Sequence, residues 1–208
     1  PLERYASPIR SCDAGRGCPF QCSFCTIINV QGRKSRHRSA DDVEALLRAH
    51  LAEGVTRFFI TDDDFARNRN WEAILDRIIE MREREGLNFG FLIQVDAQAY
   101  RIPNFVEKCK KAGCSRVFIG LETINAANLL AAKKRQNKIE KYREMLQAWR
   151  AVGIITFCGY ILGFPEDTAE SIKHDIETLK RALPVDCLEF FILTPLPAAA
   201  PPVGGVGD

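Results

Sequence analysis

The chain has 208 residues, of which 46% are hydrophobic and 27% charged, and this composition is typical of one globular domain with a substantial core. Its 29 Lys and Arg residues against 27 Asp and Glu leave a net charge of +2, which gives no sign of a nucleic-acid or acidic-membrane partner. No apolar run approaches the roughly 20 residues that cross a bilayer, and a signal-peptide pattern is missing, so we expect a cytoplasmic protein without a membrane span.

Short apolar, β-branched and aromatic runs alternate along the chain with amphipathic helical stretches. The expected strands are residues 9–14, 55–61, 88–95, 115–122, 154–162 and 185–193. The expected helices are one that Ser39 caps and Gly54 ends, then residues 70–85, 103–112, 138–152, and one from the cap Thr168 to residue 183. This alternation indicates βαβ units and a parallel sheet, because parallel neighbours need crossover connections. Periodicity leaves open a doubly wound sheet, a complete barrel, or a partial barrel of six units.

Polar residues follow the predicted strands at the points where the strands end. In sheets and barrels of this class, functional groups gather at the carboxyl ends of the strands. The residues found there are a cysteine loop after the first strand, Thr61, Asp62, Asp63 and Asp64 after the second, Gln94 and Asp96 after the third, Glu122 after the fourth, and Gly163 to Glu166 after the fifth. We expect them to meet at one edge of the sheet.

The last residues of the chain differ in kind from the rest. Residues 195–208 are rich in Pro, Gly and Ala and have no period, which predicts a disordered or non-native tail after a core domain of residues 1–194.

Eight cysteines in a chain with long helical periods and a large core indicate reduced thiols rather than a disulfide scaffold. Five of them are scattered, and we expect small buried hydrophobic residues at Cys12, Cys109, Cys114, Cys158 and Cys187. The other three, Cys18, Cys22 and Cys25, lie within eight residues of one another, without a fourth nearby.

Three clustered thiols restrict the kind of site. A structural zinc ion takes four ligands, usually from two CxxC pairs, and catalytic zinc sites rely on His. Pro19 and the flanking glycines disfavour a helix that would bury the three thiols on one face. A cubane iron–sulfur cluster ordinarily takes four thiolates, so three would leave one iron open to a ligand that is not protein.

The spacing Cys18-x3-Cys22-x2-Cys25, with the aromatic Phe24 before the last cysteine, resembles the signature of the radical S-adenosylmethionine (radical SAM) enzymes. The resemblance covers about residues 9–194 and implies an α/β fold, a partial (β/α)6 TIM-like barrel with parallel strands. It also implies that the three cysteines bind a [4Fe–4S] cluster, whose fourth iron takes the amino and carboxylate groups of S-adenosylmethionine (SAM). The implied enzyme cleaves SAM reductively to a 5′-deoxyadenosyl radical, draws electrons from an external flavodoxin- or ferredoxin-type donor, and is oxygen-sensitive.

The resemblance extends to the SAM-binding residues. GYILGFPE matches the family's fifth-strand GxIxGxxE pattern, which implies that Gly159, Ile161 and Gly163 lie against the adenine. Where the family often has Gly-Gly-Glu after the second strand, this chain departs from it. The residues that could accept hydrogen bonds from the methionyl ammonium in its place are Thr61, Asp62 and Asp63, while Asp64 could instead cap a helix. The resemblance implies that Glu122 meets the ribose or the methionyl group, with Gln94 and Phe24 in the same surroundings.

Three further segments, Asp-Asp-x-Phe, GLET and GFPEDT, resemble the branch of radical SAM proteins that often carries a cobalamin-binding domain. Its members include methyltransferases, with methylthiotransferases as relatives, and the sequence leaves both reactions open. The cobalamin motif Asp-x-His-x-x-Gly is absent from this chain, so cobalamin would come through a domain not present here. The substrate, a small molecule or a peptide, is not indicated.

Two alternatives accompany this interpretation. The chain could be a non-catalytic iron–sulfur electron-transfer module, or an inactive truncated one.

The basic residues 33–38 could contact a phosphate-bearing substrate, but the near-neutral net charge favours a solvated loop and makes nucleic acid an unexpected partner. The run Lys133-Lys134-Arg135 is interpreted as a helix surface or a loop, with a substrate role left open.

Overall fold

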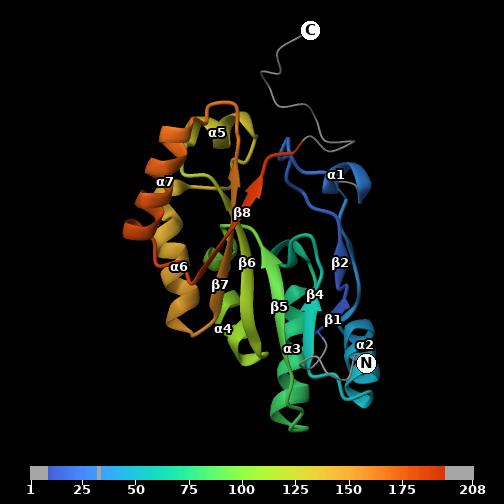
Figure 1. Ribbon diagram of the computed structural model, residues 1–208. Helices are drawn as coiled ribbons and strands as arrows, with labels where there is room; N and C mark the ends of the chain where they lie inside the picture. Colours follow the sequence, from blue (N-terminus) through green and yellow to red (C-terminus); the bar gives the residue numbers. More distant parts are fainter. Residues whose placement is uncertain (1–8, 32–33, 195–208) are drawn as a thin grey trace, which may run out of the picture.

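The computed structural model describes residues 9–31 and 34–194 of the chain. Its main sheet has six strands in the order β1-β4-β5-β6-β7-β8, and every neighbouring pair is parallel. The strands are β1 (Ile9–Cys12), β4 (Arg57–Ile60), β5 (Gly90–Val95), β6 (Cys114–Glu122), β7 (Ile155–Leu162) and β8 (Cys187–Ile192). All six predicted strands are therefore confirmed. Because β1 and β8 are the two edges of the sheet, the architecture is the predicted partial (β/α)6 barrel (Figure 1).

Five helices connect successive strands of the sheet and lie along one of its faces (Figure 1). They are α2 (Ala40–Ala52), α3 (Trp71–Glu83), α4 (Phe105–Lys111), α6 (Tyr142–Ala151) and α7 (Ala169–Ala182). The predicted caps Ser39 and Thr168 both form capping boxes, in which the side chain of the cap and that of the residue three positions later each accept a hydrogen bond from the other residue's backbone N–H.

Two predicted helix boundaries are wrong. The helix expected from Pro103 begins at Phe105, because Asn104 has a φ of 61° and so lies in the left-handed region. The helix expected over 138–152 is divided into a 3-10 turn, η4 (Ile139–Lys141), and α6.

Several short elements were not predicted. β2 (Gly15–Arg16) and β3 (Arg36–His37) form a separate antiparallel pair, which places β3 within the stretch interpreted as a solvated basic loop. The others are α1 (Ile27–Val30), η2 (Phe65–Arg67), η3 (Ala99–Arg101) and α5 (Ala126–Ala131). Elements of two to six residues are too short to show a periodic pattern. The predicted tail at residues 195–208 lies outside the described residues.

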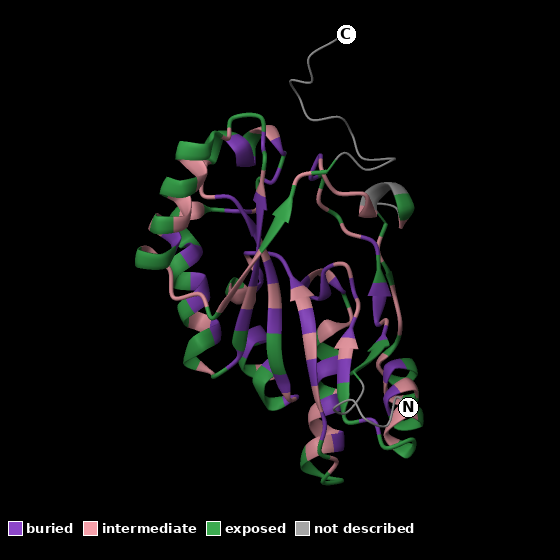
Figure 2. Cartoon of the chain, in the orientation of Figure 1, coloured by how far each residue is buried: buried purple, intermediate pink, exposed green. Residues whose placement is uncertain are grey.

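The core fills the layer between the sheet and its helices. Along β5, Phe91, Ile93 and Val95 alternate with less buried residues and point into this layer. Phe105 of α4 is fully buried, and its ring centroid lies 4.9 Å from that of Trp71 and 6.1 Å from that of Trp149. Figure 2 shows buried positions concentrated where helices and strands meet. Burial of such rings contributes about 1.5–3 kcal/mol each.

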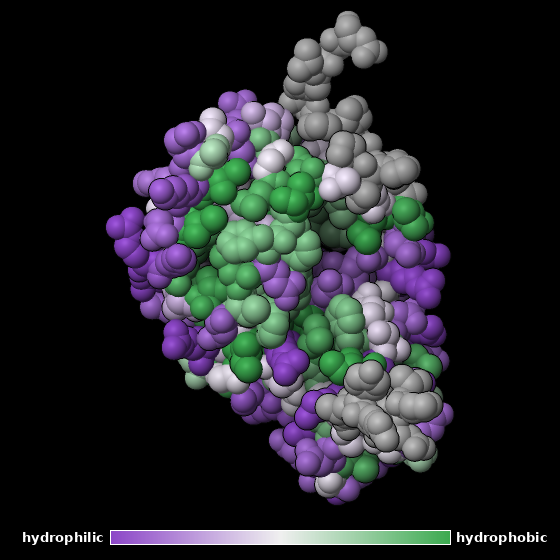
Figure 3. Space-filling view, in the orientation of Figure 1, coloured by the Kyte–Doolittle hydropathy of each residue, from purple (hydrophilic) through white to green (hydrophobic). Residues whose placement is uncertain are grey.

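The opposite face of the sheet is open. Phe191 of β8 is exposed on this face, where its ring centroid lies 6.4 Å from that of Phe118 on β6. Figure 3 shows hydrophobic residues gathered over the middle of this open face. Within the described residues, no helix combines the length and the apolar character needed to cross a bilayer.

Candidate active site

The three clustered cysteines lie between β2 and α1, beyond the carboxyl end of β1. All eight cysteines of the chain are free thiols, and Cys22 is buried while Cys18 and Cys25 are half-buried. Burial raises the pKa of Cys18 to about 12, and it also raises the pKa of Cys25. The neighbouring thiolate charge of Cys22 raises both pKa values further. Cys18 and Cys25 are therefore protonated at neutral pH, and a metal that binds them must displace their protons.

The donor set fits an iron–sulfur cluster. Among residues 9–31 and 34–194, no three His, Cys, Asp or Glu side chains converge as the ligands of a single metal ion do. Ligands of one zinc ion all lie about 2–2.3 Å from it, whereas each thiolate of a cubane binds a different iron. Three free thiols close enough to influence one another's pKa values suit a cubane anchored at three corners.

The scattered cysteines behave as predicted in four cases. Cys12, Cys109, Cys114 and Cys158 are buried, and Cys187 is half-buried. Burial raises the pKa of Cys12, Cys114 and Cys158 to about 12, so these thiols are inert.

The aspartates that follow β4 hold the start of the cysteine loop. Asp62 is 2% exposed, and its two carboxylate oxygens accept hydrogen bonds from the Ala14 N–H at 2.9 Å and the Asn68 amide at 2.8 Å. The Asn68 amide also donates to the Ala14 carbonyl at 3.1 Å. Asp63 accepts a hydrogen bond of 2.6 Å from the N–H of Gly17, whose φ is 93°. Asp62, predicted to bind SAM, is thus occupied in positioning the loop.

A second polar group lies beside the loop. Arg67 donates two hydrogen bonds, of 2.7 and 3.0 Å, to the two oxygens of Asp96, and its guanidinium lies 5.5 Å from the ring centroid of Phe20 in the cysteine loop. Asp64 occupies the N-cap position of η2, as suggested, but its side chain forms no cap bond and instead accepts a hydrogen bond from the Asp96 N–H. Burial, and then the carboxylate of Asp96, raise the pKa of Asp64 well above its usual value.

A small apolar cluster joins the cysteine loop to the fifth strand of the sheet, β7. It consists of Ile161, Phe164 and Ala132, with Phe24 and Leu193 packed against them. The rings of Phe24 and Phe164 meet edge to face with centroids 6.1 Å apart, and the Ser23 N–H donates to the Ala132 carbonyl at 2.9 Å. The structure therefore brings together the predicted residues Phe24 and Ile161.

An ion pair lies against the same loop. Glu122, with a φ of 69°, pairs with Lys134, and both side chains are 10% exposed. The Lys134 ammonium lies 5.7 Å from the ring centroid of Phe24. Burial lowers the pKa of Lys134, but the charges of Glu122, Cys22 and Cys25 raise it by more. The basic run lies in the loop after α5, one of the two places expected for it, and Lys133 and Arg135 are exposed while Lys134 is buried.

The remaining predicted residues lie in β5 and β7 or directly after β4 and β7. The Gln94 amide donates to the Asp62 carbonyl at 3.2 Å, and the Thr61 N–H donates to the Cys12 carbonyl at 2.9 Å. A Cβ at Gly159 would come within 2.9 Å of Phe118, so the glycine is needed for this close approach. Gly163 has a φ of 94°, and its N–H donates to Asp167.

Four residues that support the cysteine loop or approach its thiols were not predicted as site residues from the sequence. These are Asn68 and Arg67, which support the loop, and Lys134 and Gln136, which approach the thiols. The Gln136 amide donates a hydrogen bond of 3.4 Å to Cys22 Sγ. They belong to segments without a recognisable motif, and only the position of Lys134 after the fourth predicted strand gave a signal.

Parallel strands with a three-thiol loop beyond the first of them define the radical SAM class of fold. A family model described as the radical SAM superfamily matches residues 14–179. The chain belongs to this superfamily, which uses a [4Fe–4S] cluster and SAM as its cofactors.

Known proteins with similar sequences include methylases. A hopanoid C-2 methylase from Rhodopseudomonas palustris (strain TIE-1) is 26% identical over 86% of this chain and 35% of its own length. A bacteriochlorophyllide d C-12(1)-methyltransferase from Chlorobaculum tepidum is 27% identical over 88% of this chain and 40% of its own. The chain thus spans less than half the length of these curated relatives.

Among solved structures, the radical SAM methyltransferase TsrM from Kitasatospora setae, with cobalamin and a [4Fe–4S] cluster bound, aligns with a TM-score of 0.82. It is 20% identical, and the alignment covers 93% of this chain and 36% of that one. At this identity the likeness shows a shared fold.

Proposed function

We propose that the protein is the catalytic core of a radical SAM methyltransferase. The observation that carries the proposal is the set of three free thiols, Cys18, Cys22 and Cys25, at the carboxyl ends of a parallel sheet. When bound there, the cluster and SAM would supply one-electron cleavage of a carbon–sulfur bond, which gives a radical able to take a hydrogen atom from an unactivated carbon. An electron-transfer module would be expected to provide four thiolates, so the donor set disfavours that alternative.

The chain's own residues would bind and orient the cofactor. Phe24 and Ile161 already form one apolar surface beside the thiols, which suits the adenine. Because both oxygens of Asp62 are engaged, we assign the methionyl ammonium to Asp63 and Thr61. Asp63 uses one carboxylate oxygen for Gly17, and the second receives no hydrogen bond from a described residue.

The other predicted contacts fill out the same site. The proposal keeps Glu122 near the ribose or the methionyl group, with its ion pair to Lys134 fixing the carboxylate. Gly163 leaves its backbone open to close approach, Gly159 beside it on β7 makes room for the Phe118 ring, and Gln94 lies in the same surroundings. The core domain would comprise residues 1–194, as predicted from the sequence.

Methyl transfer as the overall reaction is supported by the two methylases that the chain resembles. Cobalamin would be contributed by a segment outside this sequence, as TsrM contains it. A cytoplasmic location and a flavodoxin- or ferredoxin-type electron donor complete the proposal, since the reaction consumes an external electron.

The test is formation of 5′-deoxyadenosine by the anaerobically reconstituted chain with SAM and dithionite. We expect product from the native chain and from Cys187→Ala, which removes a thiol far along the sequence from the loop, and none from Cys22→Ala. Product that persists in Cys22→Ala would overturn the proposal.

A further inference from the structure

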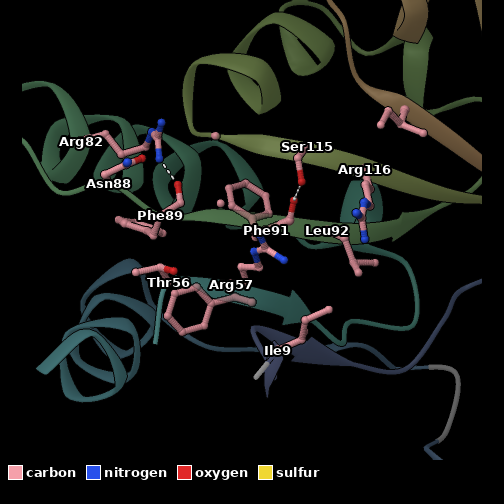
Figure 4. A pocket seen from close by; sticks show the side chains of 14 residues that line it. Ile9, Thr56, Arg57, Arg82, Asn88, Phe89, Phe91, Leu92, Ser115 and Arg116 are labelled. Carbon is pink, nitrogen blue, oxygen red and sulfur yellow. Dashed lines mark hydrogen bonds between the residues drawn. The ribbon is translucent and has the colours of Figure 1, made fainter. Parts of the chain in front are cut away.

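A groove runs along the open face of the sheet. Two adjoining cavities, of about 510 and 410 Å³, share Leu92 and Arg116 in their walls. Figure 4 shows the first of them, which lies at the amino-terminal ends of the strands. The second extends toward Gln94, whose amide donates to the Asp62 carbonyl near the cysteine loop. Cavities of this size hold small-molecule ligands.

Three arginines line the first cavity, two from different strands and the third, Arg82, from α3, where its guanidinium donates to the Phe89 carbonyl. Arg57 projects from β4 and Arg116 from β6, on either side of β5 (Figure 4). Neither forms an ion pair with a carboxylate of the described residues, unlike Arg10, which pairs with Glu53. Guanidinium groups recognise carboxylates and phosphates by charge and by paired hydrogen bonds. This end of the groove is therefore suited to an anion.

The second cavity is mainly aromatic. Its walls include Phe59, Phe118, Phe157 and Phe191, which come from four different strands. The Arg116 guanidinium lies 5.8 Å from the ring centroid of Phe157, so the cationic and aromatic parts of the groove are continuous. Such a lining favours an apolar ligand body.

The charges along the groove have a direction. Glu189 also lines the second cavity, and it pairs in register with Gly159, whereas Arg116 pairs with Ile155. Ile155 and Gly159, the partners of Arg116 and Glu189, are four residues apart on β7, so the two charges are separated by about 13 Å along the strand. An anion is thus attracted to the arginine end and repelled from the end near the cysteines. Six residues separate Arg116 from Glu122 along β6, which is about 20 Å.

We propose that the substrate is an amphiphile with a long apolar body and a terminal anionic group, a carboxylate or a phosphate. Arg57 and Arg116 bind the anion, and the phenylalanines bind the apolar body. The far end of the molecule, about 20 Å away, then lies beside the cysteine loop. The assignment rests on the proposed function, because it names the substrate class of that same site.

The experiment is equilibrium binding to the native chain by isothermal titration calorimetry. The probes are dodecanoate, dodecyl phosphate and dodecan-1-ol, each below its aggregation concentration. We expect at least one of the two anions to bind at least tenfold more tightly than the alcohol, and the two anionic arms show which group is preferred. In Arg57→Gln/Arg116→Gln this preference is lost. Arg84→Gln/Lys180→Gln, which removes the same two charges from side chains that are 78% and 67% exposed, retains it.

Equal affinity for the anions and the alcohol in the native chain would overturn the proposal, as would full retention of the preference in the double variant. The comparison of the anions with the alcohol uses the native chain alone, so it does not depend on the folding of a variant. Circular dichroism shows whether the double variant is folded. Dimerisation over this face without anion binding, seen by sedimentation velocity, would assign the face to a second copy. Binding needs no SAM cleavage, so it can fail while 5′-deoxyadenosine still forms, and the reverse.

Discussion

Removal of the Asn68 amide tests how the cysteine loop is held. Asn68 is 1% exposed, and in Asn68→Ala the buried carboxylate of Asp62 and the Ala14 carbonyl both lose a donor. A hydrogen bond to a charged group contributes about 1.5–3 kcal/mol and a neutral one about 1 kcal/mol, so we expect a loss of about 3 kcal/mol in unfolding free energy. With an m-value of about 2 kcal/mol per molar urea, the midpoint falls by about 1.5 M.

The stability lost in Asn68→Ala should depend on pH. Burial raises the pKa of Asp62, and the bond from Asn68 opposes that rise. Without Asn68 the folded-state pKa moves further above the unfolded value, so stability is retained at low pH and lost as pH rises through the folded pKa.

Urea unfolding of the metal-free chain at pH 5 and pH 8 measures the loss of unfolding free energy in Asn68→Ala and its pH dependence. The loss should be larger at pH 8. Asn88→Ala, at an exposed asparagine, is the control and should leave the midpoint unchanged. A midpoint in Asn68→Ala within about 0.3 M of the native value at pH 8, with m about 2 kcal/mol per molar, would refute the reasoning.

Three further predictions concern stability. In Asp64→Asn the urea midpoint should rise at pH 8 and match the native chain at low pH, because burial and Asp96 raise the pKa of Asp64; parallel pH profiles would contradict this. In Gly120→Ala the new Cβ would lie 2.8 Å from Lys134 Nζ, and we expect a loss of about 1–3 kcal/mol in unfolding free energy by urea unfolding. An unchanged unfolding free energy would show instead that the ion pair of Lys134 and Glu122 moves aside without cost. Phe105→Ala should cost about 3–5 kcal/mol by thermal and urea unfolding, and a cost below about 1 kcal/mol would show that the core collapses around the site.

The main sheet could be predicted from sequence because its signals are local. The run from Val55 to Thr61 consists of β-branched and aromatic residues apart from Arg57, as suits a strand covered on its helix side, and Gly54 before it ends a helix at a φ of 80°. The pairing of β2 with β3 could not be predicted, because it joins residues some twenty positions apart through only two residues on each side.

The candidate site was predictable by residue type and only partly by role. Asp62 was expected near the cysteines, but its partner Ala14 lies 48 positions away, so its use in holding the loop is a tertiary property. Lys134 looked like part of a surface charge run because its burial depends on Glu122, twelve positions earlier. Sequence spacing reveals a metal-binding loop, but it does not show which nearby charges are already paired.

The account depends most on a cluster with three protein ligands and one open iron. The direct measurement is the EPR spectrum of the reconstituted, dithionite-reduced chain before and after addition of SAM, with iron and sulfide quantified. We predict about four irons and four sulfides per chain and a spectrum that changes when SAM binds, in the native chain and in Cys187→Ala alike. A complete cluster whose spectrum is indifferent to SAM, or zinc at the thiols in place of iron, would contradict the account.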